Sequence, residues 1–186
     1  MKYLIVSDPH MENTILQNII SHEQDHVDTM FCLGDTSLKA SDPLLAPFRL
    51  VVRGNHDYDD HFPYTITYNQ ILLAHGHTYK VYYGYDMLLR AAKENHCSIV
   101  LHGHTHVPTH QVIEGIHFIN PGSVMINRGS YGFGTYAILE TNPFAIHFYH
   151  HTTFEEVGTE ILEEGLQTLE EFKKLTSAFE AHKLTR

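Results

Sequence analysis

The sequence predicts an α/β fold: a four-layer αββα sandwich of two mixed β-sheets packed face to face and flanked by helices. Two features predict it. The first half of the chain alternates short apolar β-rich runs with stretches of helical spacing, and the second half carries β-rich runs joined by short turns. Because 186 residues is about the size of one domain, we expect a single domain over residues 1–186.

The first half of the chain is predicted to contain strands that end in polar residues. Apolar residues at helical spacing over 15–20 and a helix-forming stretch over 85–95 predict two helices between these strands. Residues 36–47 contain two prolines and are predicted to form a loop with room for one helical turn. The predicted strands are 2–7, 29–33, 48–52, 71–74 and 98–101.

The second half is predicted to form antiparallel hairpins, which implies a second sheet. Its β-rich runs are 107–113, 116–119, 136–140 and 145–150. The last segment, about 159–182, places large apolar residues three or four positions apart with charged residues between them, which predicts an amphipathic helix. Two roles stay open for this helix: docking on its own domain, or a contact in a homo-oligomer.

Composition excludes several classes of partner. The net charge of −10 and the lack of any run of lysines and arginines argue against binding to duplex nucleic acid. The N-terminus enters an apolar strand without a signal peptide or membrane span, so no membrane contact is expected. Cys32 and Cys97 lie in or beside apolar runs, which suits reduced thiols in a cytoplasmic protein.

Side chains that commonly bind metals follow the predicted strands. They are Asp8, His10, Asp35, Asn55, His75, His104 and His106. Ligands gather beyond the carboxyl ends of strands in open α/β sheets, so these side chains are expected to converge. Mixed histidine, aspartate and asparagine ligation suits Mn²⁺, Fe²⁺, Zn²⁺ or Ni²⁺ rather than an all-oxygen site for Mg²⁺ or Ca²⁺. Mn²⁺ is our first expectation, although the residues do not select among the four.

Alternation along an extended segment points residues i and i+2 the same way, so Asp8 with His10, and His104 with His106, can each direct two side chains at one place. This many converging ligands predicts a site for two metal ions. Two divalent ions about 3.5 to 4 Å apart repel each other strongly, and an anion must bridge them. Asp35 stands alone after its strand and is the candidate for the shared carboxylate, with hydroxide as the second bridge.

Five motifs follow the predicted strands: Asp8-Pro9-His10, Gly34-Asp35, Gly54-Asn55-His56-Asp57, His75-Gly76-His77 and Gly103-His104-Thr105-His106. In this order they resemble the calcineurin-like metallophosphoesterase superfamily. The small size, the N-terminal Ser-Asp-Pro-His and the segment 120–124 resemble the compact bacterial and archaeal phosphodiesterases related to the retromer subunit Vps29. The resemblance covers roughly residues 1–150.

The resemblance implies a role for each of these residues. One metal ion would be held by Asp8, His10, Asp35 and His106, and the other by Asp35, Asn55, His75 and His104. The resemblance also implies that His56 protonates the leaving oxygen and that Asp57 orients it. Met11 stands where the family often has glycine, so the backbone there is expected to differ.

Together these expectations describe an enzyme that hydrolyses a small phosphate ester, a diester and also a monoester, by hydroxide activated at two metal ions. Arg53 and Arg128 are candidates for binding a phosphate oxygen, although a structural ion pair is at least as reasonable for each. The seven tyrosines from Tyr58 to Tyr85 could stack an aromatic group of the substrate or pack in the core.

The alternative from another class is a Vps29-like protein-binding scaffold with a structural metal site. A scaffold would be expected to have lost some of the site residues, whereas this chain retains all of them. A protein phosphatase or nuclease of the same superfamily ranks third, because such proteins generally carry additional domains or long insertions.

Overall fold

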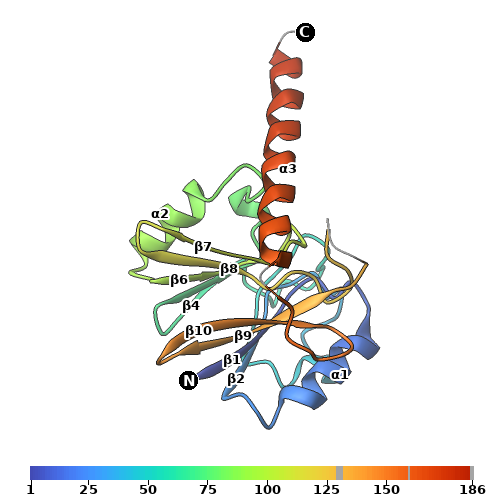
Figure 1. The fold of residues 1–186 in the computed structure, drawn as a ribbon. Helices are drawn as coiled ribbons and strands as arrows, with labels where there is room; N and C mark the ends of the chain where they lie inside the picture. Colours follow the sequence, from blue (N-terminus) through green and yellow to red (C-terminus); the bar gives the residue numbers. More distant parts are fainter. Residues whose placement is uncertain (129–131, 159, 185–186) are drawn as a thin grey trace.

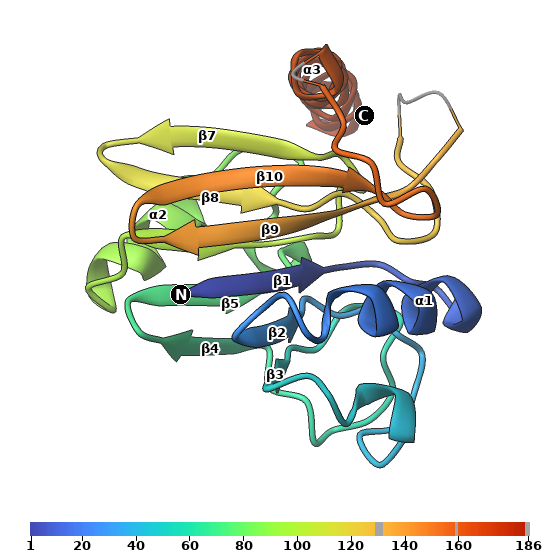
Figure 2. The ribbon, with the colours of Figure 1, turned by 60° about the horizontal axis from the view of Figure 1, so that its bottom comes forward.

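The computed structural model describes residues 1–128, 132–158 and 160–184, with side chains up to Leu175 in the last helix. Two five-stranded mixed sheets pack face to face (Figure 1, Figure 2), which confirms the predicted fold class. The first sheet, in the order β10-β9-β1-β2-β3, contains β1 (Lys2–Val6), β2 (Thr29–Cys32), β3 (Leu50–Val51), β9 (Thr135–Thr141) and β10 (Phe144–His150). The second sheet, in the order β4-β5-β6-β8-β7, contains β4 (Thr65–Tyr68), β5 (Ile71–Ala74), β6 (Ile99–Leu101), β7 (Thr109–Ile113) and β8 (Ile116–Asn120).

Helices cover the outer faces of the two sheets. Alternation along β1 points Tyr3 and Ile5 into the core between the sheets, and Leu4 and Val6 onto α1 (Asn13–Glu23). The outer face of the second sheet packs against α2 (Asp86–Glu94) through a third apolar cluster. Each fully buried aliphatic or aromatic side chain contributes about 1.5 to 3 kcal/mol. Three apolar layers therefore hold four layers of secondary structure together.

The direction of the strands brings their carboxyl ends to one edge of the sandwich. In the first sheet β1, β2 and β3 run parallel, and in the second sheet β5, β6 and β8 run parallel. The predicted strand ends at 29–33, 71–74 and 98–101 agree with β2, β5 and β6 to within one residue. Short 3₁₀ turns, η1 (Pro43–Leu45) and η2 (His77–Tyr79), lie in the loops that follow.

The hairpins differ from the sequence prediction, because they do not build a second sheet of their own. The hairpin β7–β8 extends the second sheet and the hairpin β9–β10 extends the first, where β9 pairs antiparallel with β1. Strand β4 was not predicted. It is joined to β5 by Asn69 and Gln70, both at positive φ of 47° and 63°. Glutamine is unusual in such a two-residue turn, so the hairpin signal was weak.

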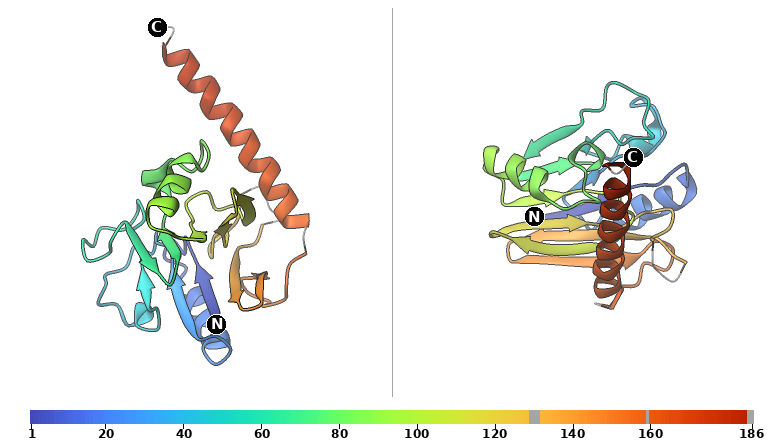
Figure 3. Two further views of the ribbon diagram at one scale, coloured as in Figure 1. Left: turned by 90° about the vertical axis from the view of Figure 1, so that its left-hand side faces the viewer. Right: turned by 90° about the horizontal axis from the view of Figure 1, so that it is seen from above.

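The C-terminal helix α3 (Glu160–Leu184) matches the predicted amphipathic segment closely. Its first half packs on the domain, where Ile161 and Leu169 are 4% and 5% exposed. Its far end extends well beyond the sheets, as Figure 3 shows. Docking of the first half is thus observed, and a homo-oligomeric role for the projecting half stays a prediction. Among the described residues, no helix has the length and apolar character needed to cross a membrane.

Gly165 allows α3 to approach the second sheet closely. A methyl group there would lie 2.6 Å from the carbonyl oxygen of Pro108 and 2.8 Å from the Val107 side chain. Glycine inside a helix is less favourable than alanine by about 1 kcal/mol, so the close approach is achieved with a less stable helix.

Gly165→Ala is expected to loosen α3 even though alanine favours the helix, because the Pro108 backbone blocks the added methyl group. Hydrogen exchange of the α3 amides should accelerate about 10-fold or more relative to the wild type, the factor set by a loss of about 1.4 kcal/mol. The control Gln167→Ala changes an exposed residue of the same helix and should leave exchange unchanged or slower. Slower exchange in Gly165→Ala would show that α3 is not held by this contact.

Candidate metal centre

The predicted ligands lie on the loops that follow β1, β2, β5 and β6 and the short strand β3, at the shared edge of the two sheets. Backbone hydrogen bonds tie these loops to one another. The Asp8 N–H donates to the Gly34 carbonyl at 3.0 Å, and the Gly103 N–H donates to the His75 carbonyl at 2.9 Å. The first bond joins loops of the first sheet and the second joins loops of the second sheet. The His104 N–H links the two sheets by donating to Asp8 Oδ2 at 3.1 Å, so the loops form one connected platform.

Asp8 is held through one carboxylate oxygen and presents the other. Its Oδ2 accepts hydrogen bonds from Ser7 Oγ at 2.5 Å and from the His104 N–H at 3.1 Å. Its Oδ1 is buried, and it lies 3.1 Å from His106 Nε2 and 3.7 Å from His75 Nε2 without forming a hydrogen bond. Burial raises the pKa of Asp8, but the nearby histidines outweigh it and hold the pKa well below its usual range. The group is thus an available carboxylate.

Asp35 repeats this arrangement. Its Oδ1 accepts a hydrogen bond from the His56 N–H at 2.7 Å. Its Oδ2 lies 3.3 Å from His75 Nε2 and 3.7 Å from His10 Nε2. The free oxygen therefore faces one histidine from the first sheet and one from the second, which is the position that a shared ligand would need.

The histidines turn their Nε2 atoms to the same region. His10 Nε2 and His106 Nε2 lie only 3.1 Å apart. The Nδ1–H of His75 donates to the Leu33 carbonyl at 2.7 Å, which fixes the ring and leaves Nε2 buried and unpaired. Such a hydrogen bond on the far nitrogen is the usual support of a histidine that binds a metal.

The arrangement fits divalent metal ions. Three groups of side chains bring potential ligand atoms within 4.8 Å of one another: Asp8, His10 and His106; His10, Asp35 and His56; and Asp8, Asp35 and His75. Leaving Asp8 Oδ1 and His75 Nε2 buried without partners would cost about 1 to 3 kcal/mol each. Bound cations would satisfy both atoms, and the mixed nitrogen and oxygen donors suit transition metals.

Asn55 and His104, the two other predicted ligands, line the same pocket as several residues of these groups. The pocket, which we call the metal pocket, has a volume of about 380 Å³. Burial, together with the charge of His75, lowers the pKa of His104 to about 3, so its imidazole is neutral and able to bind a metal. The residues that line the pocket are His10, Asp35, Asn55, His56, His104, His106, Met125 and Arg128.

His56 is exposed at the metal pocket, and its ring meets the His10 ring edge-on at 5.1 Å between centroids. Asp57 does not orient it, contrary to the expectation. The Asp57 carboxylate instead accepts hydrogen bonds from five donors: Asp35 N, Thr36 N, Thr36 Oγ1, Ser37 N and Gly54 N, at 2.7 to 2.9 Å. Asp57 is therefore a buried anchor for the loop that carries Asp35.

Backbone conformation also aims the ligands. The predicted ligands Asp8, His10, Asp35, His104 and His106 all have positive φ, between 44° and 68°. Non-glycine residues rarely adopt this conformation, and it concentrates at functional sites. Met11 has φ of 71° and a side chain that is 70% exposed, so it takes the glycine-like backbone without filling the pocket.

The two candidate arginines have different surroundings in the structure. Arg53 forms an ion pair with Asp60 at 2.6 Å and lies over the Tyr64 ring at 5.3 Å, and it does not line the metal pocket. This ion pair is the structural alternative that the sequence left open for Arg53. Arg128 lines the metal pocket, and its contact with substrate stays a prediction.

Several supporting residues were missed in the sequence. Ser123 Oγ donates to the Asp8 carbonyl at 2.8 Å, and Asn120 Nδ2 donates to the Gly103 carbonyl at 3.0 Å and to Thr105 Oγ1 at 2.9 Å. Both belong to the segment 120–124 that contributed to the family resemblance, which was the one available signal. Periodicity alone does not mark such residues.

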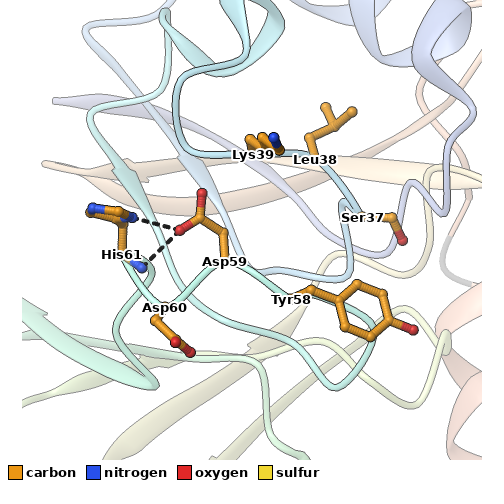
Figure 4. Close-up of a pocket in the computed structure, with 7 residues that line it drawn as sticks. All are labelled: Ser37, Leu38, Lys39, Tyr58, Asp59, Asp60 and His61. Atoms are coloured by element: carbon orange, nitrogen blue, oxygen red, sulfur yellow. Dashed lines mark hydrogen bonds and ion pairs between the residues drawn. The ribbon is translucent and has the colours of Figure 1, made fainter.

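A second pocket is lined by residues of the two loops that continue from Asp35 and from His56. We call it the outer pocket, and it measures about 590 Å³. Tyr58 is 84% exposed there, and Figure 4 shows its ring directed away from the hydrogen-bonded pair Asp59 and His61. The outer pocket is lined by Ser37, Leu38, Lys39, Tyr58, Asp59, Asp60 and His61.

Comparison with known proteins agrees with this geometry. The family described as "Calcineurin-like phosphoesterase superfamily domain" matches residues 1–143. The chain is 32% identical over 167 residues to the probable metallophosphoesterase YsnB of Bacillus subtilis, covering 87% of this chain and 95% of that protein.

Solved structures share the fold. A Streptococcus pneumoniae protein described as a predicted phosphoesterase has 29% identity and a TM-score of 0.74, over 81% of this chain and 89% of the other. Vps29 of Entamoeba histolytica complexed with zinc has 24% identity and a TM-score of 0.66, over 84% and 96% of the respective chains. The second likeness concerns the fold alone.

Metal binding is expected to release protons and to strengthen as pH rises. Burial lowers the pKa of His75, but Asp8 and Asp35 outweigh it and raise the pKa to about 9 in the metal-free protein. The proton on His75 therefore competes with a metal ion below about pH 9. Calorimetric titration with Mn²⁺ in buffers of different ionisation enthalpy should detect the release, and His75→Asn should release fewer protons. An affinity independent of pH between about 6 and 9 would contradict a metal at His75.

Proposed function

The chain belongs to the calcineurin-like phosphoesterase superfamily, and we propose that it hydrolyses a small phosphate ester, a diester and also a monoester, at two divalent metal ions. The observation that carries the proposal is the convergence of Asp8 Oδ1, Asp35 Oδ2 and three histidine Nε2 atoms on one region. When bound, the metal ions would lower the pKa of a water molecule and neutralise charge on the phosphoryl oxygens.

The ligands divide between two ions. We propose that Asp8, His10, Asp35 and His106 hold one ion, and that Asp35, Asn55, His75 and His104 hold the other. The two-sided position of Asp35 Oδ2, between His10 and His75, supports a shared carboxylate. Asp57 supports the same role because it fixes the backbone of Asp35 and of the facing Gly54.

His56 is proposed to donate the proton that the leaving oxygen requires. His56 is exposed at the metal pocket. Its backbone N–H donates a hydrogen bond to Asp35 Oδ1, which keeps the imidazole ring next to the metal centre. A ring nitrogen of His56 also comes within 4.8 Å of ligand atoms of His10 and Asp35, so direct metal binding is the competing role. The outer pocket begins two residues beyond His56 and offers space for the leaving group.

A protein-binding scaffold is the second candidate, and the shared fold with Vps29 favours it. The hydrolytic proposal is stronger for this chain because every expected ligand is present and two buried ligand atoms are unpaired. A scaffold needs no open pocket beside its metal, whereas here His56 and Arg128 border one.

The purified protein is expected to hydrolyse bis-p-nitrophenyl phosphate when Mn²⁺ is added, and its activity should fall to background with a chelator, because bound metal ions would lower the pKa of the attacking water. Release of p-nitrophenolate measures the rate. Adding Mn²⁺ back after chelation is the control for unfolding. If the metal-loaded protein cleaves neither this diester nor p-nitrophenyl phosphate, the scaffold function replaces the proposal.

His56→Ala is expected to retain both metal ions and to lose about 10²- to 10⁴-fold in kcat on esters with poor leaving groups, because a general acid is removed. Esters with p-nitrophenolate as leaving group should be affected much less. His26→Ala, at an exposed histidine outside both pockets, is the matched control. Equal slowing on all leaving groups would exclude His56 as the acid, and loss of metal content would make it a ligand.

A further inference from the structure

We infer that Arg128, which lies against the rings of Tyr82 and of Phe172 in α3, binds a second anionic group of the substrate. This inference rests on the proposed hydrolytic function and narrows its substrate class. The preferred substrates are phosphate esters whose organic part carries another phosphate or a carboxylate near the reacting phosphate.

The backbone of Arg128 is fixed to the metal centre. Its N–H donates to the carbonyl of the predicted ligand His106 at 2.8 Å. Its side chain is exposed and lines the metal pocket. The guanidinium therefore stands at the mouth of the pocket and outside the close groups of ligand atoms.

Two aromatic rings hold the guanidinium in place. The Arg128 Cζ lies 5.7 Å from the Tyr82 ring centroid and 5.9 Å from that of Phe172, and the two rings meet edge-on at 5.5 Å. Cations over aromatic faces at this range are attracted by the ring quadrupole. Tyr82 is itself fixed because its hydroxyl donates to the His104 carbonyl at 3.1 Å. The arginine is thus preorganised by groups tied to the metal-site loops.

Helix α3 supplies Phe172 to this arrangement. Ile161, Gly165, Leu169 and Phe172 follow one another at steps of four, four and three residues, so they share one face of the helix. The first three pack on the domain or approach it closely, which sets the position of the fourth. This face of the helix therefore brings Phe172 to the side chain of Arg128 at the metal pocket.

The charges favour a second anion as the ligand of Arg128. Among the described residues that line the metal pocket, Arg128 is the one lysine or arginine. The chain has a net charge of −10, which repels a substrate with several negative charges unless a local cation offsets it. In the proposed function the metal ions would bind the reacting phosphate, so Arg128 would be available to bind a second anionic group of the substrate. A guanidinium suits phosphate and carboxylate because it donates two parallel hydrogen bonds.

Two esters that differ only in the second anion test this inference. Thymidine 5′-(p-nitrophenyl phosphate) carries one phosphate, and its 3′-phosphorylated derivative carries two, with the same reacting ester and leaving group. The wild type with Mn²⁺ is expected to prefer the second ester by about 10-fold or more in kcat/KM. Arg128→Gln should lower kcat/KM by about 10- to 100-fold for this ester, the range for a lost charge-assisted hydrogen bond, and little for the other.

Phe172 is tested as a positioning residue. Phe172→Leu should raise KM for the doubly charged ester several-fold with little change in kcat, and Phe172→Tyr should restore it, because an aromatic face is regained. Arg90→Gln removes the same charge from the exposed surface of α2 and is the control for long-range electrostatics. If Arg90→Gln lowers kcat/KM for the doubly charged ester as much as Arg128→Gln does, the inference is overturned.

Binding provides a readout independent of turnover. Calorimetry should show that the wild type binds thymidine 3′,5′-bisphosphate about 10-fold more tightly than thymidine 5′-monophosphate, and that Arg128→Gln removes the difference. If Arg128→Gln weakens both ligands and both esters equally, the inference is wrong while the hydrolytic function stands. If neither ester is cleaved, the proposed function fails and the inference with it.

Discussion

The rest of this structure depends on the need to compensate the charges of two buried carboxylates. Asp8 and Asp35 follow the neighbouring parallel strands β1 and β2, and they are 0% and 1% exposed. Their negative charges would repel each other at this depth unless cations lay between them. His75 provides one such charge from the second sheet in the metal-free protein, and metal ions would provide more. The packing of one sheet against the other is therefore linked to the electrostatics of the site.

Holding those carboxylates in place requires unusual local structure. Five predicted ligands have positive φ, and a methyl group at Gly54 would collide with the Asp35 side chain. The five hydrogen bonds accepted by Asp57 offset part of this strain, because four of them satisfy backbone N–H donors in the two adjoining loops. Rigid loops of this kind reduce the reorganisation that accompanies metal binding and catalysis.

The sequence predicts the fold class and the strand ends well because both depend on local alternation of apolar and polar residues. The sheet to which a hairpin belongs depends on distant pairing, such as β9 with β1, and no local pattern encodes it. The same limit applies to the site. The positions of Asp8 and Asp35 could be predicted, whereas the anchoring role of Asp57 and the ion pair of Arg53 with Asp60 required three-dimensional neighbours.

Gly165 makes one position of the chain a marker for comparing relatives. A larger residue there cannot coexist with the present approach of α3 to Pro108, whatever its helix propensity. A homologue with a bulkier side chain at the equivalent position must hold its last helix elsewhere, and it would then lack an aromatic ring at the place of Phe172. The residue at that single position therefore indicates whether a relative can hold its last helix at the mouth of the metal pocket as this chain does.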